Sequence, residues 1–233
     1  MPTVYACRNS RSKWWRRASL FALLLVIAVG CAPCQPPEVF QALTSTAPPC
    51  WNRICPGTTS SSELHKILEG LSEVDPSEIG SSPVGAPIAR TGWRFSRSRA
   101  PGYGTGNCVY LDGVVANCTF SYGGRGLRLQ HIIEKYGDPE FIIPIAGYAD
   151  TRCLQVVLMY PECGFETGYL VPTWTSAEIT LSPNTKIHGY SIFAPDLYGQ
   201  LLDASLWFSA TREEVQEWQR PWPGYGTFVV DVP

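Results

Sequence analysis

The stretch Val109-Tyr110-Leu111-Asp112-Gly113-Val114-Val115-Ala116 places the dipeptide Asp112-Gly113 between two apolar, β-rich runs. Asp-Gly is typical of the two-residue turn that joins antiparallel strands, because both positions of that turn need a positive φ. The stretch therefore predicts a β-hairpin, and with it an antiparallel sheet.

Helical patterns lie on both sides of this hairpin. Ser60 and Glu63 have the spacing of a capping box, as do Thr211 and Glu214 near the C-terminus. A middle helix is predicted to end at Gly137, since glycine is favoured just past the last helical turn. The apolar faces of the first and middle helices comprise Leu64, Ile67, Leu68 and Leu71, and Leu129, Ile132, Ile133 and Tyr136.

Further strands are predicted from β-branched and aromatic runs that follow the middle helix. The chain then alternates helix, strands, helix, strands, helix. This order predicts an α+β fold with a mainly antiparallel sheet. The predicted strands cover residues 141–145, 154–160, 165–171, 177–181 and 186–193.

Residues 1–30 have the pattern of a secretory signal. A basic segment ends at Arg16-Arg17, and an uncharged apolar run follows up to Gly30. The run is shorter than the roughly 20 residues that a membrane-spanning helix needs. We therefore expect residues 1–30 to be a signal peptide.

The end of this run, Ala28-Val29-Gly30-Cys31, resembles the lipoprotein box of bacterial lipoproteins. The resemblance implies that the thiol of Cys31 receives a diacylglyceryl group and that the signal is cut just before it. Fatty chains such as palmitate would then hold the protein at the extracytoplasmic side of a membrane, at the cell surface or in the periplasm. The alternative is an ordinary secreted protein in which Cys31 is free to form a disulfide.

Residues 31–62 are rich in proline, serine and threonine, and we expect them to form a tether. Proline lacks the backbone donor that helices and internal strands use. Residues 63–233 would then form one α+β globular domain.

A second resemblance concerns the middle helix. Gly126, Ile132, Tyr136, Gly137 and Pro139 reproduce the spacing of small lipoproteins of the BamE/SmpA type, in which a helix runs into a hairpin. The resemblance spans about residues 126–171 and departs from the family at Arg128, where a Thr usually caps the helix. It implies a sheet built of helix-plus-hairpin units, and a lipid-anchored binding or assembly module outside the cytoplasm. An envelope protein or a glycan is the candidate partner.

The cysteines of an exported chain are candidates for disulfides. Cys50 and Cys55 are close enough to close a small loop. Cys108 and Cys118 flank the Asp-Gly turn, but a two-residue turn alone pairs residue 108 with 117, so a disulfide there needs a bulge. A bond from Cys153 to Cys108 or Cys118 is the further candidate.

Charge and motifs limit the function classes. Five basic and no acidic residues lie in residues 1–30, which leaves 13 basic and 20 acidic residues in the rest of the chain. This acidic balance of −7 argues against a nucleic-acid partner. His65, His131 and His188 lack any metal spacing, and the glycine clusters lack the spacing of nucleotide loops. We therefore expect no metal, no cofactor and no enzymatic activity.

Two segments are candidates for binding. Arg94, Arg97 and Arg99 belong to a basic segment interleaved with aromatic residues, which suits either an anionic partner or a solvated strand edge. Near the C-terminus, Trp218, Trp222 and Tyr225 suit either an exposed platform for a glycan or peptide, or a plug at the end of the sheet.

These observations predict a membrane-anchored extracytoplasmic lipoprotein with a non-enzymatic binding or envelope-assembly role. Two alternatives stay open. An extracytoplasmic hydrolase would gather His131, His188 or carboxylates in a deep pocket. A secreted carbohydrate-recognition module would expose Trp218 and Trp222 to solvent.

Overall fold

The computed structural model describes residues 38–82, 89–96, 103–122, 126–146, 154–171, 177–203 and 211–230. The chain divides into two units, Met1–Gln35 and Pro36–Pro233. All described residues belong to the second unit. The predicted signal peptide and the predicted lipidation site at Cys31 lie outside the described residues, as do Arg97, Arg99 and Cys153.

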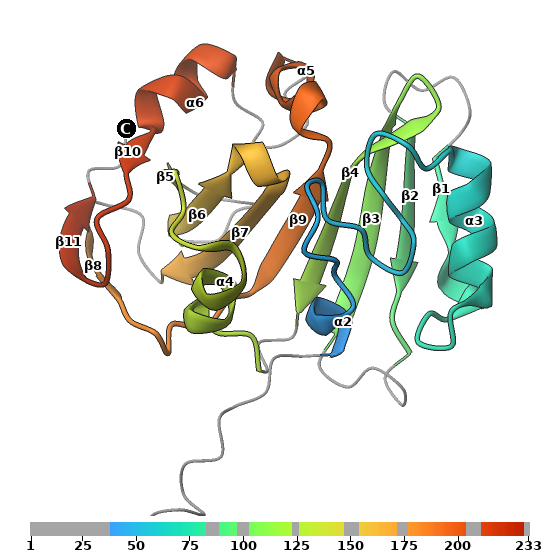
Figure 1. Ribbon diagram of the computed structural model, residues 1–233, viewed down its shortest axis with the longest axis horizontal. Coiled ribbons are helices and arrows are strands. Elements are labelled where there is room, and N and C mark those ends of the chain that lie inside the picture. Colours follow the sequence, from blue (N-terminus) through green and yellow to red (C-terminus); the bar gives the residue numbers. More distant parts are fainter. Residues whose placement is uncertain are drawn as a thin grey trace, which may run out of the picture. The chain divides into compact units, whose positions relative to one another are not determined.

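An antiparallel sheet of nine strands forms the centre of the second unit (Figure 1). A separate two-stranded sheet pairs β8 (Ala177–Leu181) with β11 (Gly226–Val230). The prediction of an α+β fold with a mainly antiparallel sheet is confirmed at this level. In spatial order, the nine strands are β1 (Gly80–Ser81), β2 (Ala89–Arg94), β3 (Tyr103–Leu111), β4 (Val114–Tyr122), β9 (Gly189–Phe193), β7 (Phe165–Val171), β6 (Leu154–Tyr160), β5 (Phe141–Ala146) and β10 (Arg220–Pro221).

The strand order contains two meanders, β2–β3–β4 and β5–β6–β7, and β9 lies between them. Strand β9 pairs with β4 on one side and with β7 on the other, and both pairings are antiparallel. Strand β9, which follows both meanders in the sequence, therefore joins them into one sheet.

The predicted hairpin is present as β3 and β4. Asp112 and Gly113 form its turn with φ of 51° and 80°. The register shifts between Val109 and Tyr110, so that Cys108 faces Cys118 directly. Their Cα atoms are 4.0 Å apart and a disulfide joins the two residues. The bulge thus supplies the one-residue shift that this bond requires, and a bond from Cys153 to either cysteine is ruled out.

The longer helices begin and end where the sequence indicates. Both capping boxes are present, Ser60 with Glu63 at the start of α3 (Ser61–Gly70) and Thr211 with Glu214 at the start of α6 (Arg212–Trp218). Helix α4 (Leu129–Tyr136) ends at Gly137, whose φ is 80°. Shorter elements are α2 (Glu38–Gln41), α5 (Tyr198–Asp203), η1 (Pro76–Glu78), η2 (Pro161–Cys163) and η3 (Pro195–Leu197).

The prediction of a tether over residues 31–62 is wrong from residue 38 onward. Helix α2 lies in this segment, and Phe40, Leu43, Trp51 and Ile54 are almost completely buried in the core. The Nζ of Lys135 on α4 donates to the carbonyl oxygen of Leu43 at 2.7 Å. Prolines limit regular structure in this segment, but burial of large apolar side chains does not require regular structure.

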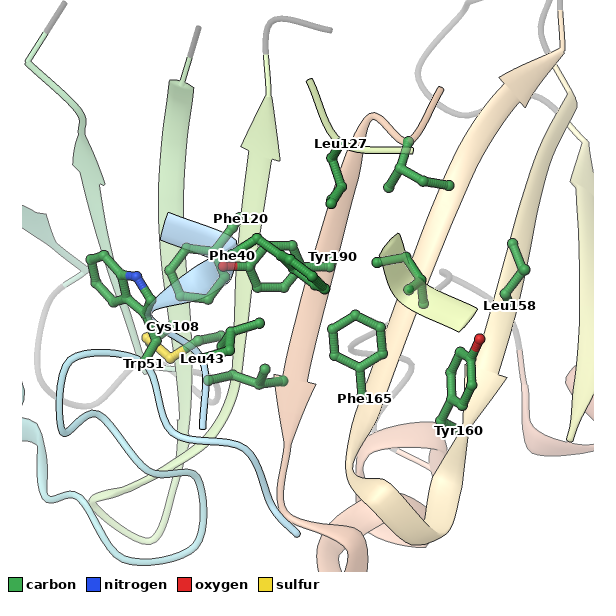
Figure 2. Close-up of a cluster of buried hydrophobic side chains, with 14 of the residues drawn as sticks. Phe40, Leu43, Trp51, Cys108, Phe120, Leu127, Leu158, Tyr160, Phe165 and Tyr190 are labelled. Atoms are coloured by element: carbon green, nitrogen blue, oxygen red, sulfur yellow. A yellow bond between two sulfur atoms is a disulfide. The ribbon is translucent and has the colours of Figure 1, made fainter. Parts of the chain in front are cut away.

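The sheet has a separate apolar cluster on each face. The first cluster is the larger, and both α3 and α4 bury their apolar residues in it. Figure 2 shows its centre, where Phe40 from α2 lies among Phe120, Phe165 and Tyr190 from three strands. The second cluster contains residues of β5, β6, α5 and α6. Strand β6 contributes to both clusters, which explains its almost unbroken apolar sequence.

Candidate functional site

The predicted basic segment is divided between surface and core. On β2, Arg90 and Arg94 are exposed, whereas Trp93 is buried and Phe95, just after the strand, is also buried. The alternation follows from the period of a strand. Arg94 Nη1 lies 3.9 Å from Glu78 Oε1 at the surface. Trp93 and Phe95 are therefore core residues, and a joint basic surface of Arg94, Arg97 and Arg99 stays a prediction.

The predicted C-terminal aromatic residues do not form one surface. Trp218 on α6 is half-buried against the second cluster, and Trp222 is half-buried against the first. Tyr225 is 45% exposed and meets Trp222 edge-to-face, with ring centroids 6.3 Å apart. Only this last pair has the exposed ring that stacking on a glycan would need.

Each of the three histidines is bound to nearby structure. His65 Nε2 lies 2.8 Å from Ser81 Oγ. His131 Nδ1 accepts the backbone N–H of Arg128 at 3.1 Å, which is the bond that the third helical residue makes in a capping box, although the Arg128 side chain forms no cap hydrogen bond. His188 Nδ1 accepts the N–H of Leu170 at 3.3 Å, and burial, together with the charge of Lys186, lowers the pKa of His188. Among the described residues, no group of histidines, cysteines and carboxylates is arranged to hold a metal.

His131 also lines an open hollow of about 320 Å³ with Glu134 and Lys135. The amine of Lys135 donates to the carbonyl of Leu43 and lies 4.9 Å from the ring centre of Phe40, and burial lowers its pKa. His131 and Lys135 thus support α4 and the N-terminal segment. We assign this hollow a structural role.

A row of polar side chains crosses β4, β9 and β7 on the face of the second cluster. Ser191 Oγ donates to Glu166 Oε1 at 2.6 Å and lies 2.9 Å from Thr119 Oγ1. Thr119 in turn donates to Asn117 Oδ1 at 3.2 Å. Ser191 is 1% and Glu166 is 8% exposed. Within this row, the serine hydroxyl that donates to a carboxylate is the pair that could act as a nucleophile and its base.

The loop between Cys50 and Cys55 is a miniature hairpin. A disulfide joins the two cysteines, and Trp51 and Ile54 exchange both backbone hydrogen bonds at 2.9 and 2.7 Å. Trp51 and Ile54 are fully buried. The two residues between them therefore form the tip of a turn that the core, the disulfide and the backbone bonds hold together.

Both residues of this tip adopt left-handed backbone conformations, with φ of 45° at Asn52 and 71° at Arg53. Asparagine tolerates this region, but it costs other side chains about 1–2 kcal/mol. Glycine would avoid that cost at position 53. Backbone strain that a glycine would relieve is often found at functional sites.

Arg53 lines two open hollows of about 390 and 400 Å³ between this hairpin and α3. Lys66 and Ile67 line both hollows as well. The first is completed by Asn52, Gly70 and Leu71, and the second by Thr58, Thr59 and Glu63. Because the two hollows share three residues, we treat them as one surface and name it the Arg53–Lys66 groove.

The sequence interpretation missed both the groove and the polar row. The groove lies in the segment assigned to the tether, although Cys50-Trp51-Asn52-Arg53-Ile54-Cys55 carries a usable signal: apolar residues flank a polar pair inside a short cysteine loop. For the polar row, Ser191 and Glu166 are 25 residues apart. Only the pairing of β7 with β9 brings them together.

No helix of the described residues is both long enough and apolar enough to cross a lipid bilayer. No protein-family model, curated protein or solved structure matches the chain.

Proposed function

We propose that the protein is an extracytoplasmic lipoprotein, anchored through Cys31, with a non-enzymatic binding or envelope-assembly role. The observation that carries this proposal is the pair of disulfides, Cys50–Cys55 and Cys108–Cys118, in the folded unit. Structural disulfides are frequent in exported proteins and rare in the cytosol. They agree with the export signal and the lipoprotein box that the N-terminal sequence suggests.

The assembly role rests on the unit formed by α4 and the strands after it. Gly137 ends α4, and β6 and β7 then form a hairpin around η2. The resemblance to BamE/SmpA-type lipoproteins covers this region, in which the sheet would be built of helix-plus-hairpin units. A protein partner in the envelope is the expectation that follows, and a glycan bound at Trp222 and Tyr225 is the alternative.

The anchor is tested by Cys31→Ser, with Cys163→Ser as the matched control. Cys163 is a free, half-buried cysteine of the described unit. Cys31→Ser should abolish metabolic labelling with palmitate and release the protein from membranes, whereas Cys163→Ser should keep both. A Cys31→Ser protein that stays labelled and membrane-bound contradicts the anchor. Crosslinking in intact cells, followed by purification, then tests for a specific envelope partner.

A hydrolase is the second candidate function, favoured by the 2.6 Å hydrogen bond from Ser191 to Glu166. In that case Ser191 would be the nucleophile and Glu166 its base. Purified protein would then hydrolyse p-nitrophenyl acetate, and Ser191→Ala would abolish the activity. Equal rates for the native and variant proteins would exclude Ser191 as a nucleophile.

A further inference from the structure

The Arg53–Lys66 groove places two cationic side chains from different elements around one open space. Arg53 comes from the tip of the disulfide hairpin and Lys66 from the middle of α3. Both are exposed, and within the described part of the chain neither side chain forms a hydrogen bond or an ion pair. The charge of Lys66 contributes to the lowered pKa of Glu63, but neither cationic head is held by a direct bond, so both can reach a ligand in the groove.

The tip that carries Arg53 is held in place by several independent contacts. Asn52 Nδ2 donates to Glu73 Oε1 at 2.9 Å, and this bond ties the tip to the segment after α3. Thr59 Oγ1 accepts the backbone N–H of Cys55 at 2.8 Å. With the disulfide and the buried Trp51 and Ile54, these contacts fix the backbone from which Arg53 extends. A ligand would meet a preorganised wall, which lowers the entropy that binding loses.

The left-handed φ of Arg53 is the second argument for a ligand. Stability alone would favour glycine at this position, because glycine has no Cβ to crowd the backbone. An arginine side chain that is exposed and without a partner in the described fold offers no compensating contact. Recognition of an anion would compensate for the strain.

The carboxylates beside the groove, those of Glu63 and Glu73, accept hydrogen bonds from groups other than the two cations. Glu63 Oε2 accepts both the N–H and the hydroxyl of Ser60, at 2.9 and 2.7 Å, and these hydrogen bonds lower the pKa of Glu63. Glu73 accepts from Asn52 and from Ser72. Hydrogen bonds from Ser60, Asn52 and Ser72, and not from the two cations, therefore position these carboxylates.

We propose that the Arg53–Lys66 groove binds the phosphate group of a small phosphate ester, with the phosphate between the two cations. Guanidinium binds phosphate through two parallel hydrogen bonds, and an ammonium adds a compact charge. Each hollow, at about 390 and 400 Å³, exceeds the size of one phosphate. Thr58 and Asn52 would face the polyol part of the ester, and Ile67 and Leu71 its apolar part. The site is independent of the anchor at Cys31.

Such an ester has two sources with the same chemistry: a soluble metabolite or the headgroup of an anionic phospholipid. Binding of glycerol 3-phosphate to the purified full-length protein is measured by calorimetry. Binding to vesicles of phosphatidylglycerol is measured by sedimentation against phosphatidylcholine, so that any anchor contributes equally to both. Saturable binding of glycerol 3-phosphate identifies a soluble ligand, and a preference for phosphatidylglycerol alone identifies the headgroup.

Three variants decide whether the groove is responsible. Arg53→Gly and Lys66→Gln should each weaken binding at least tenfold, and Arg53→Gly should leave the melting temperature unchanged or raise it. Lys186→Gln removes the same charge from an exposed site elsewhere and should change binding less than twofold. The proposal is overturned if neither probe binds, or if all three variants bind as the native protein does.

Discussion

The two meanders on either side of β9 share a plan but differ in construction (Figure 1). In each half, a helix precedes three antiparallel strands, α3 before β2–β4 and α4 before β5–β7. The strand order of one half is the reverse of the other about β9, yet both helices bury residues in the same cluster. A half-turn about an axis along β9 would place each half on the other, but it would also turn the sheet over. The two helices would then lie on opposite faces, whereas both lie on the face of the first cluster. The halves therefore cannot be superimposed as rotated copies.

The halves also differ in what stabilises them. The first half contains the Cys108–Cys118 disulfide, and the hairpin closed by Cys50–Cys55 packs against it through Trp51, which stacks on Trp93 with ring centroids 5.9 Å apart. Gly106 allows this arrangement, since a Cβ at that position would collide with the Trp93 ring. The second half has no disulfide among its described residues and contains tyrosines in and against the core, such as the half-buried Tyr136, which stacks on Phe165 with ring centroids 4.3 Å apart. The first half should therefore respond to reduction, and the second to alkaline pH.

The largest effect is expected for Trp51→Ala. Trp51 is fully buried and contacts Trp93, Phe95 and Phe120. Removal of a buried indole should lower the free energy of unfolding by about 3–5 kcal/mol, measured by urea denaturation. Trp222→Ala, at a half-buried position, is the control and should cost less. An effect of Trp51→Ala no larger than that of Trp222→Ala would contradict the placement of the N-terminal hairpin in the core.

Loss of the cross-strand disulfide should have the next largest effect. The variant Cys108→Ala/Cys118→Ala opens a loop with a sequence separation of 10 residues. The expected loss is about 2–3 kcal/mol from the greater entropy of the unfolded chain. Hydrogen exchange should accelerate more in β2–β4 than in β5–β7. Cys163→Ala should have little effect, and uniform acceleration in both halves would remove the distinction between them.

Alkaline pH should act mainly on the second half. Burial raises the pKa of Tyr136, Tyr160 and Tyr169 well above 10. The unfolded chain ionises first, so stability should fall as the pH rises past about 10. Between pH 9 and 11, Tyr160→Phe should reduce this fall in the free energy of unfolding. Tyr110→Phe in the first half is the comparison, because Tyr110 donates to Thr91 at 2.7 Å and that bond partly offsets its raised pKa. Identical pH slopes for the two variants would argue against this difference.

The smallest effect concerns His188, which lies just before β9. Its folded pKa is lowered, first by burial and then by Lys186, so stability should decline as the pH falls below about 6.5. Protonation of Nδ1 also removes the acceptor for the N–H of Leu170. We expect less than about 1 kcal/mol between pH 7 and 5. His188→Gln should flatten this dependence in thermal unfolding, and an unchanged dependence would exclude His188 as its source.

Local signals account for much of the fold. The Asp112-Gly113 turn, the two capping boxes and the stop at Gly137 were all predictable, because each depends on backbone geometry within a few residues. The boundary of the folded unit was not predictable in the same way. Proline composition indicated a tether, while the burial of Phe40 and Trp51 depends on distant strands, which supply Tyr190 against Phe40 and Phe120 against Trp51.

The candidate sites follow the same division. The spacing of Cys50 and Cys55 was enough to suggest their disulfide, but Arg53 and Lys66 line one hollow only because α3 packs beside the hairpin. The pairing of Cys108 with Cys118 needed a bulge whose presence the composition does not reveal.

By itself, the sequence determined the local turns, the helix ends and the α+β class, because these depend on torsional preferences and short-range hydrogen bonds. The tertiary structure alone decided the insertion of β9 between two meanders, the row from Asn117 to Glu166, and the Arg53–Lys66 groove. Each of these is a contact between distant segments. Such contacts are selected by the burial of apolar surface over the whole sheet, which no local pattern encodes.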